Sequence, residues 1–372
     1  MPGAGMEDRG EESARSPGGH AERQMRKRRS VREEGQPKER VTLADVAARA
    51  GISETTASHV LTGKRYVAAA TKARVMLAVR ELGYRPNLVA RSLRVRSTQT
   101  IAFIVNDIGN VSLTTSIRGS ASLLRQRGFA IDMVDSPEEG LSTAVVQQVL
   151  DRIPTGIIFF GEMPSRRVSE QIESAGVPFV VGGLGEPHPE TCDVVYTDQE
   201  AAVRAVTALL AASVPRRRIC FFGGDADDEG ARARLAGFHS GMRLADRVVE
   251  EGDVLFVPYS IDGGMAAMER IDDVPAAIVA GSDQIAQGAL IVARERGIRV
   301  PEQLRVVGFD NIESCRVTTP PLSSIDVGLV SQGLVCAELL LDRIEGRYVG
   351  PGRVIAHDTT FVERGSTGEL RR

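Results

Sequence analysis

Four polar residues on one short predicted helix are suited to contact the edges of DNA bases. Residues 54–61 carry Glu54, Thr55, Ser58 and His59 away from the apolar positions of the helix. A threonine hydroxyl can hydrogen bond to several bases, and a glutamate can accept a hydrogen bond from a cytosine amino group. We favour Thr55 and His59 as base contacts, with Glu54 third. Two alternatives stay open, because His59 could contact a phosphate and Glu54 could stabilise the positive end of its own helix.

A first helix and a tight turn would hold this second helix in place. Residues 43–50 are alanine-rich, with apolar residues at helical spacing. Gly51 tolerates the positive φ of a sharp turn, and Ser53 is a good N-cap for helix 54–61. A polar helix held in this way can enter a DNA major groove. The same pattern is also compatible with two helices that merely pack together.

The residues that follow favour the DNA-binding interpretation. A third helix is predicted over 71–82, ended by Gly83. The residues expected to face inward on it are Ala73, Val75, Met76, Val79 and Leu82. The segment 41–96 resembles the headpiece and hinge of bacterial repressors of the LacI/GalR family. The matching residues are Asp45-Val46-Ala47, Ala50-Gly51-Ile52-Ser53, Thr56, Ser58, Val60-Leu61, Gly83-Tyr84, Pro86-Asn87 and Ala90-Arg91-Ser92-Leu93.

The resemblance implies further DNA contacts. In the family a leucine of the hinge helix enters the minor groove at the centre of the operator; Leu93 matches it, and Arg94 follows it. Such a wedge unstacks a base step, at a cost offset by contacts with the bent DNA. Two hinge helices must meet there, which implies a homodimer on a near-palindromic double-stranded operator. Residues expected to contact the DNA backbone are Thr42, Ser58, Lys64 and Arg65.

Charge is unevenly distributed along the chain. The 372 residues have a formal net charge of −3, yet residues 41–98 carry ten basic and three acidic residues, and residues 99–372 carry a net −12. A small basic module joined to a large acidic one suits nucleic-acid contact at one end only. Residues 1–40 are too polar to form a core, so we expect a disordered tail. Its run Arg26-Lys27-Arg28-Arg29 is either a solvated segment or a source of non-specific phosphate affinity.

Composition restricts location and cofactors. No apolar run reaches the length of a membrane span, and the N-terminus lacks the apolar core of a signal peptide. The four cysteines form no CxxC pair, which is typical of reduced thiols, and the five histidines lack metal-ligand spacing. We therefore expect a cytoplasmic protein, associated with the nucleoid when bound to DNA, without a metal or cofactor.

From residue 98 the pattern alternates between strands and helices. Strands are predicted at 100–105, 129–134, 156–160, 177–181, 194–196, 218–222, 254–257, 276–280, 305–309 and 353–360. Helices are predicted at 113–127, 138–152, 165–174, 199–212, 229–244, 263–271, 284–296 and 329–344. This alternation predicts parallel, doubly wound α/β sheets, and about 270 residues are enough for two subdomains.

The family resemblance continues through this region and implies a periplasmic-binding-protein-like core. The matching segments are Arg234–Phe238, Gly281–Ala286, Gly297–Pro301, Val306–Asp310 and Thr319–Ile325. In the family the chain crosses between the subdomains three times, which by resemblance falls near Tyr196, Arg299 and Asp326. The expected domains are a tail (1–40), a helix-turn-helix headpiece (41–86), a hinge helix and linker (87–98), and a core (99–366). Within the core we expect an N-subdomain (about 99–196 and 299–326) and a C-subdomain (about 197–298 and 327–366).

A small-molecule effector would bind in the cleft between the subdomains, at the carboxyl ends of the strands. By resemblance, Asp283 and Arg234 would contact it, and Tyr259 would flank it. Asp283 is equally placed to cap the helix that follows it. Ser112 and Leu113 are also expected to contact the effector, by their position after the first strand of the core. At two positions where relatives carry sugar-binding groups, this chain has Ser112-Leu113 in place of an aromatic pair and Gly183 in place of an aspartate. These departures leave the class of effector open and make a sugar doubtful.

An enzyme and a solute-binding module are the two alternatives to this interpretation. The glycine clusters at 182–185 and 223–224 each follow a strand, but neither forms GxGxxG at the start of a helix. Acidic residues beside the second cluster would repel a pyrophosphate, and no catalytic motif is present, so we do not expect an enzyme. A solute-binding module that only carries its ligand would need an export signal and no headpiece. The sequence therefore predicts a DNA-binding regulator of the LacI/GalR type, and the resemblance implies a repressor.

Overall fold

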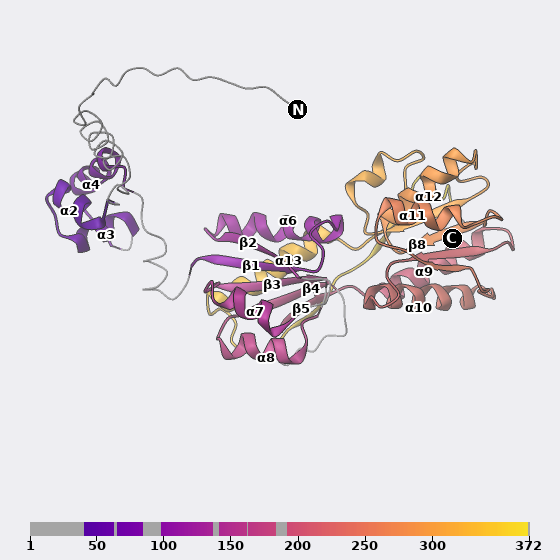
Figure 1. The fold of residues 1–372 in the computed structure, drawn as a ribbon, viewed down its shortest axis with the longest axis horizontal. Helices are drawn as coiled ribbons and strands as arrows, with labels where there is room; N and C mark the ends of the chain where they lie inside the picture. Colours follow the sequence, from indigo (N-terminus) through magenta and orange to yellow (C-terminus); the bar gives the residue numbers. More distant parts are fainter. Residues whose placement is uncertain are drawn as a thin grey trace, which may run out of the picture. The chain divides into compact units, whose positions relative to one another are not determined.

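The computed structural model describes residues 41–62, 65–84, 98–136, 141–161, 163–183 and 192–370. It divides into two compact units, Met1–Asn87 and Leu88–Arg372 (Figure 1). The predicted tail (1–40) and most of the predicted hinge lie outside the described residues, as do Lys64, Leu93 and Arg94.

The first unit has the predicted order of helix, turn and helix. Its described residues form the helices α2 (Leu43–Ala50), α3 (Glu54–Thr62) and α4 (Ala69–Leu82). Gly51 ends α2 at φ 64°, and Gly83 ends α4 at φ 63°. Both values lie in the left-handed region, which glycine adopts without a steric penalty.

The small core between these helices differs from the sequence prediction on α4. Val75 and Ala78 are buried against residues of α2 and α3, while Val79 and Leu82 lie half-buried beside them. Ala73 is exposed and Met76 is 39% exposed, so their predicted inward orientation is wrong. Successive residues of a helix are rotated by about 100°, so Met76 lies to one side of the stripe that Val75 and Ala78 define.

The second unit contains two six-stranded sheets. The first has the order β11-β5-β4-β3-β1-β2 and is parallel throughout. Its strands are β1 (Thr100–Val105), β2 (Ala130–Asp135), β3 (Gly156–Gly161), β4 (Phe179–Gly183), β5 (Asp193–Tyr196) and β11 (Val354–Ala356). The second has the order β12-β10-β9-β8-β6-β7, in which only β12 runs antiparallel to its neighbour. Its strands are β6 (Ile219–Gly223), β7 (Val254–Phe256), β8 (Ala277–Ala280), β9 (Arg305–Phe309), β10 (Ser323–Asp326) and β12 (Thr360–Val362).

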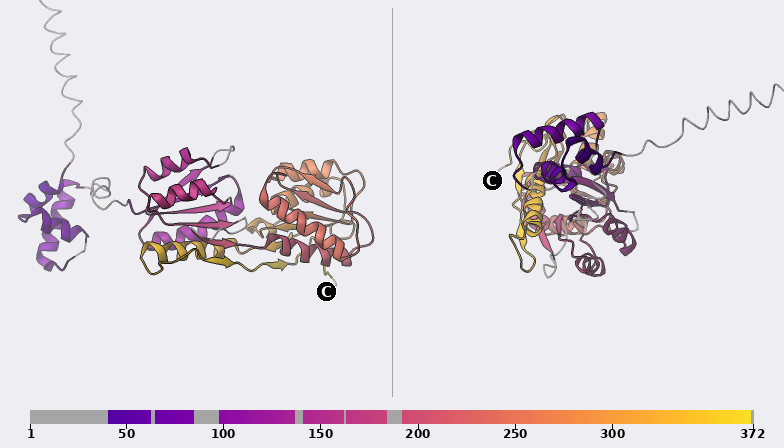
Figure 2. Two further views of the ribbon diagram at one scale, coloured as in Figure 1. Left: turned by 90° about the horizontal axis from the view of Figure 1, so that it is seen from below. Right: turned by 90° about the vertical axis from the view of Figure 1, so that its left-hand side faces the viewer.

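Helices cover both faces of each sheet (Figures 1 and 2). The first sheet packs against α6 (Val111–Gln126), α7 (Thr143–Leu150), α8 (Arg166–Ser174) and α13 (Leu329–Ile344). The second packs against α9 (Gln199–Ser213), α10 (Glu229–Leu244), α11 (Ile261–Glu269) and α12 (Asp283–Glu295), with a short 3₁₀ turn at Glu313–Arg316. The predicted doubly wound α/β core is therefore confirmed. None of the described helices is long and apolar enough to cross a membrane.

The chain crosses between the two subdomains three times, but one predicted crossing is wrong. The first crossing follows β5 at Tyr196, as expected. No crossing occurs near Arg299, because β8, β9 and β10 are neighbours in the second sheet. The second crossing follows β10 at Asp326 and leads to α13, which packs on the first sheet. The third lies between β11 and β12, so the predicted strand 353–360 is in fact two strands in different sheets.

These crossings exchange two predicted segments between the subdomains. Residues 299–326 belong to the C-subdomain with β6 to β10, and α13 and β11 belong to the N-subdomain with β1 to β5. The connections lie side by side, because the backbone N–H of His357 donates to the carbonyl of Tyr196 at 2.7 Å. Connecting segments of this kind are a suitable place for a hinge at which the angle between the subdomains changes.

Candidate DNA-binding surface and ligand cavity

Helix α3 keeps a polar face clear of the headpiece core. Ala57 is fully buried, which fixes which side of the helix faces inward. Glu54 and Thr55 are exposed, and Ser58 and His59 are half-buried. The four predicted contact residues therefore share the part of α3 that faces away from the core. Their roles toward DNA remain predictions.

Hydrogen bonds at the helix ends fix the orientation of this surface. Ser53 caps α3, since its Oγ accepts from the backbone N–H of Thr56 at 3.3 Å. Thr42 caps α2 in a reciprocal arrangement: its Oγ1 accepts from the N–H of Asp45 at 3.3 Å, and its own N–H donates to the Asp45 carboxylate at 2.7 Å. The Thr42 hydroxyl also donates to the Asp45 carboxylate at 2.7 Å, and the hydrogen bonds from the Thr42 N–H and hydroxyl hold the pKa of Asp45 below its usual range. Thr42 thus has a structural role that sequence analysis missed, in addition to its predicted phosphate contact.

Two exposed side chains follow α3. Arg65 is exposed, as a backbone contact would require, and the neighbouring Tyr66 is 97% exposed. An aromatic ring that the protein leaves in solvent is a further candidate for contact with DNA. No periodic pattern of residues around Tyr66 indicates its exposure in advance.

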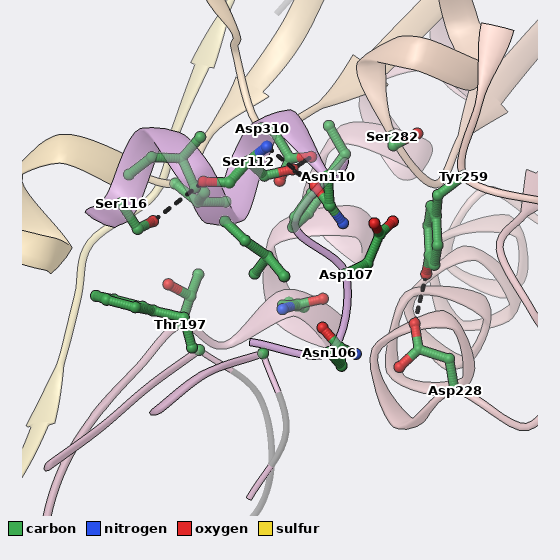
Figure 3. Close-up of a pocket in the computed structure, with 18 of the residues that line it drawn as sticks. Asn106, Asp107, Asn110, Ser112, Ser116, Thr197, Asp228, Tyr259, Ser282 and Asp310 are labelled. Atoms are coloured by element: carbon green, nitrogen blue, oxygen red, sulfur yellow. Dashed lines mark hydrogen bonds between the residues drawn. The ribbon is translucent and has the colours of Figure 1, made fainter. Parts of the chain in front are cut away.

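The second unit holds a cavity of about 540 Å³ between its subdomains. Its walls are the loops that follow β1, β6, β7, β8 and β9, the carboxyl-terminal residues of β3 and β4, and residues of the crossing segments (Figure 3). All of these loops leave the carboxyl ends of parallel strands, where open α/β sheets bind ligands. The cavity therefore lies where sequence analysis placed the effector site.

The N-subdomain wall is built from small and polar residues. Ser112 and Leu113, both predicted, line the cavity at the start of α6. Asn110 caps that helix, because its Oδ1 accepts from the Ser112 backbone N–H at 3.0 Å. Gly183 has φ 135°, and a Cβ there would lie 3.0 Å from the backbone of Gly161. The backbone therefore requires glycine at 183, and the aspartate common in relatives would be strained there.

The C-subdomain wall is organised around Arg234. This residue is only 7% exposed, and its Nε donates to Gln199 Oε1 at 2.6 Å. Its Nη1 donates to the carbonyl of Gly281 and to the hydroxyl of Tyr259, the latter at 3.3 Å. The guanidinium also lies over the ring of Phe309, 4.2 Å from the ring centroid. Arg234 and Tyr259 line the cavity as predicted, and the hydrogen bonds of Arg234 also connect Gln199, Tyr259 and Gly281 within the wall.

Tyr259 is fixed by a second partner. Its hydroxyl donates to Asp228 Oδ2 at 2.7 Å, while Asp228 also caps α10 through the N–H groups of Gly230 and Ala231 (Figure 3). Burial raises the pKa of Tyr259 well above its usual value, so the ring stays neutral. Gly224 makes room for it, because a Cβ at that position would overlap the Tyr259 ring. The second glycine cluster thus serves packing, which explains it without a phosphate.

Asp283 does not line the cavity, so its predicted effector contact is wrong. It is 1% exposed and holds the C-subdomain together: Oδ1 accepts from the Ser324 hydroxyl at 2.6 Å, and Oδ2 accepts from the N–H of Ile312 at 2.8 Å. The alternative role as N-cap is also wrong, because the Ser282 hydroxyl caps α12 by accepting from Ile285 N–H at 3.3 Å. The two neighbours of Asp283, Ser282 and Gln284, line the cavity instead.

Asp310 is the buried carboxylate of the cavity, and sequence analysis missed it. It follows β9 directly, is 7% exposed, and has φ 103°, a strained conformation for a residue other than glycine. Its Oδ2 accepts from the Ser112 hydroxyl at 2.7 Å, so the two subdomains are joined by a hydrogen bond across the cavity (Figure 3). Strain and burial at the end of a strand are typical of a functional site.

Burial controls the ionisation of Asp310. It raises the pKa of Asp310 to about 6, although the nearby charge of Arg234 and the Ser112 hydrogen bond lower it. Burial likewise raises the pKa of Asp283 to about 7, with the charge of Asp310 as the second cause. Within the described residues no group of His, Cys, Asp or Glu side chains is arranged to hold a metal ion.

Comparison with known proteins agrees with this architecture. Residues 42–87 match the family of bacterial regulatory proteins, lacI family, and residues 206–367 match the periplasmic binding protein-like domain. The HTH-type transcriptional regulator CelR of Thermobifida fusca is 32% identical over 338 residues, covering 87% of this chain and 97% of CelR. Catabolite control protein A of Priestia megaterium is 29% identical over 324 residues, covering 83% and 96%.

Two solved structures show the same fold. The lac repressor bound to ONPG in its repressed state superimposes with a TM-score of 0.77 at 25% identity, covering 88% of this chain and all of the other. The complex of the transcriptional regulator CelR with cellobiose has a TM-score of 0.63 at 29% identity, again covering 88% of this chain and all of the other.

A helix-turn-helix unit followed by a two-subdomain α/β core with a polar cavity defines a class: DNA-binding regulators that respond to small molecules. Within that class, the chain belongs to the LacI family. It is a DNA-binding transcriptional regulator and not an enzyme, as the regulators to which it is similar indicate.

Proposed function

We propose that this chain acts in the cytoplasm as a homodimeric repressor of a near-palindromic operator, controlled by a small molecule in the cavity between its subdomains. The observation that carries the proposal is the hydrogen bond from Ser112 to Asp310, which joins the two subdomains across a polar cavity. The similar regulator CelR was solved in complex with cellobiose, which supports a small-molecule ligand for this chain.

A ligand in this cavity would act on the angle between the subdomains. To reach Asp310 it must replace or rearrange the Ser112 hydrogen bond, so its affinity depends on how far the subdomains are closed. Any ligand that favours one angle shifts the protein toward that angle. If DNA affinity also depends on the angle, the two binding events are coupled, and each changes the affinity of the other by the same factor.

Recognition of DNA would be divided between a base-reading helix and a hinge. Thr55 and His59 would contact base edges, Glu54 either a base or its own helix end, and Arg65 the backbone. Leu93, outside the described residues, would insert in the minor groove between two hinge helices, with Arg94 beside it. This arrangement is what makes a homodimer necessary.

Selection of bound fragments from genomic DNA with the full chain tests the proposal. We expect enriched sites that share a near-palindromic motif. On that motif, His59→Ala should relax preference at one position per half-site, while the control Arg65→Ala should weaken binding to all sequences and reduce the salt dependence. Leu93→Ala should weaken specific binding in a titration at fixed salt without unfolding the core. Enrichment of random sequence, or operator affinity unchanged by Leu93→Ala, would contradict the proposed recognition.

A further inference from the structure

The ionisable side chains that line the cavity are mostly acidic. Six are carboxylates and two are guanidiniums, so the formal charge of the lining favours a cation over an anion. The carboxylates are Asp107, Asp225, Asp227, Asp228, Glu229 and Asp310, and the guanidiniums are Arg232 and Arg234. Asp107 belongs to the N-subdomain and the others to the C-subdomain, so acidic groups face the cavity from both sides (Figure 3).

Among the described residues, neither guanidinium forms an ion pair with this lining, although the charge of Arg234 lowers the pKa of Asp310. Arg234 uses Nε and Nη1 to donate to Gln199, Tyr259 and Gly281, and its plane lies over Phe309. Arg232 is exposed on α10, where solvent weakens its interaction with other charges. Among the described residues, no ion pair reaches any of the six carboxylates.

Asp310 separates this site from an ordinary acidic surface. It is more than nine-tenths buried, and within the described part of the chain the one side chain that donates to it is the neutral Ser112, at Oδ2. Buried carboxylates in proteins are normally paired with a cation or hydrogen bonded at both oxygens. Asp310 thus presents a carboxylate oxygen to the cavity with no cation of the described residues against it.

We propose that the ligand of this cavity is a small organic cation, whose ammonium group binds the carboxylate of Asp310 and takes the place of the Ser112 hydroxyl. The inference rests on the proposed effector role of the cavity and adds the chemical class of the effector. An ammonium group supplies several donors and a full positive charge, which a carboxylate binds more strongly than a neutral hydroxyl. Asp107 and the ring of Tyr259 line the same cavity and would stabilise the positive charge further.

Equilibrium dialysis of the full chain tests the class directly. The probe is an equimolar mixture of neutral sugars, amino sugars, aliphatic diamines, nucleosides and organic acids at pH 7.5, with retained compounds identified by mass spectrometry. We expect the retained compounds to be cations. Asp310→Asn should lower their retention at least about tenfold, because it replaces a charge-assisted hydrogen bond with a neutral one.

Asp246→Asn is the matched control. Asp246 is exposed, lies outside the cavity lining, and has φ 51°, which asparagine tolerates. It removes one negative charge from the same unit, so retention of cations by this variant should equal that of the unmodified protein. Retention of neutral or anionic compounds, retention that Asp310→Asn leaves unchanged, or no retention of any compound would each overturn the inference.

A DNA-binding readout separates this inference from the proposed function. Each retained compound is added to a titration of the full chain on its selected DNA site. A neutral compound that is retained and shifts DNA affinity would overturn the cation and leave ligand control of DNA binding in place. Cations that are retained without any shift in DNA affinity would support the cation site and contradict the effector role.

Discussion

Two buried carboxylates in the core, Asp193 and Asp310, have opposite surroundings. Asp193 is fully buried at the start of β5 and forms ion pairs with Arg343 at 2.7 Å and Arg353 at 2.8 Å. Asp310 is nearly as buried but, among the described residues, accepts a side-chain hydrogen bond from Ser112 alone. Burial raises the pKa of both; at Asp193 the hydrogen bonds from Arg343 and Arg353 outweigh it and hold the pKa below its usual range, whereas that of Asp310 rises to about 6.

The difference distinguishes a charge that stabilises the fold from one that is available to a ligand. The Asp193 cluster joins β5 to α13 and to the segment before β11, so it fastens the two parts of the N-subdomain that the crossings separate. Among the described residues, the Asp310 side chain accepts no hydrogen bond from its own subdomain, and it faces a cavity. A buried group whose partner is missing costs stability, and such groups concentrate at functional sites.

The largest expected effect is at the paired carboxylate. Asp193→Ala leaves the partly buried guanidinium of Arg343 without a counter-ion and that of Arg353 with Asp342 alone, so we expect the core to lose about 3–5 kcal/mol of unfolding free energy. Urea unfolding of the full chain, followed in the core transition, measures this. Asp132→Ala is the control, because its ion pair with Arg152 is solvent-exposed and should contribute less than about 1 kcal/mol. Equal losses of unfolding free energy in Asp193→Ala and Asp132→Ala would contradict the special role of the Asp193 ion pairs.

Asp283 should behave as a structural residue despite its raised pKa. Asp283→Ala removes the acceptor for the Ser324 hydroxyl and leaves the N–H of Ile312 unsatisfied, so we expect a loss of about 2–4 kcal/mol. Ligand retention per folded molecule should be unchanged, since Asp283 lies outside the cavity lining. If Asp283→Ala were as stable as the unmodified protein but no longer retained ligand, Asp283 would be a ligand-binding residue after all.

Asp310→Asn should raise the unfolding free energy, whereas the two substitutions above lower it. The folded protein must keep a buried carboxylate ionised at pH 7 against a pKa of about 6, whereas the ordinary value is 3.8. Asparagine removes that cost, so we expect the variant to gain roughly 1–3 kcal/mol in the absence of ligand. Urea unfolding at pH 7 without added ligand measures the gain. A destabilised variant would mean that Asp310 supports the fold in the manner of Asp193.

The pH dependence of that gain provides a separate check. Between about pH 4 and pH 6 the folded state holds a proton on Asp310 that the unfolded state has released, so unfolding free energy contributed by this group falls as pH rises through that window. The difference in stability between Asp310→Asn and the unmodified protein should therefore be near zero below pH 4 and fully developed above pH 6. Parallel stability curves across this range would contradict the raised pKa.

Sequence patterns predicted the local structure well. Helices α10 and α13 and strand β9 begin and end where they were expected, and the caps at Gly51, Ser53 and Gly83 are confirmed. Each of these depends on residues that are neighbours in the chain. The misassigned segment 299–326 depends instead on which sheet edge β9 and β10 join, and nothing in the strands themselves specifies that choice.

The error between Asp283 and Asp310 has a similar cause. Both residues follow strands of the second sheet at their carboxyl ends, so strand position alone places either one beside a ligand. Ser282 takes the N-cap position of α12, which places Asp283 in the first turn with its side chain toward Ser324. Asp310 leaves β9 with φ 103°, a conformation that residue type does not predict for aspartate and that only the folded backbone specifies.

The smallest expected change in unfolding free energy is in the headpiece, where a hydrogen-bonded threonine can be compared with an exposed one. Thr42 has its partner in Asp45, whereas Thr55 is exposed on α3. Thr42→Ala removes a capping hydrogen bond, so we expect the headpiece to lose about 1 kcal/mol, while Thr42→Ser should retain most of it. Thr55→Ala should change stability by less than about 0.5 kcal/mol and lower only sequence-specific DNA affinity. Thermal unfolding followed by circular dichroism, with DNA titrations at fixed salt, separates these outcomes. If Thr42→Ala and Thr42→Ser weakened DNA binding equally without a change in stability, the capping role would be secondary, because serine keeps the cap and should preserve both.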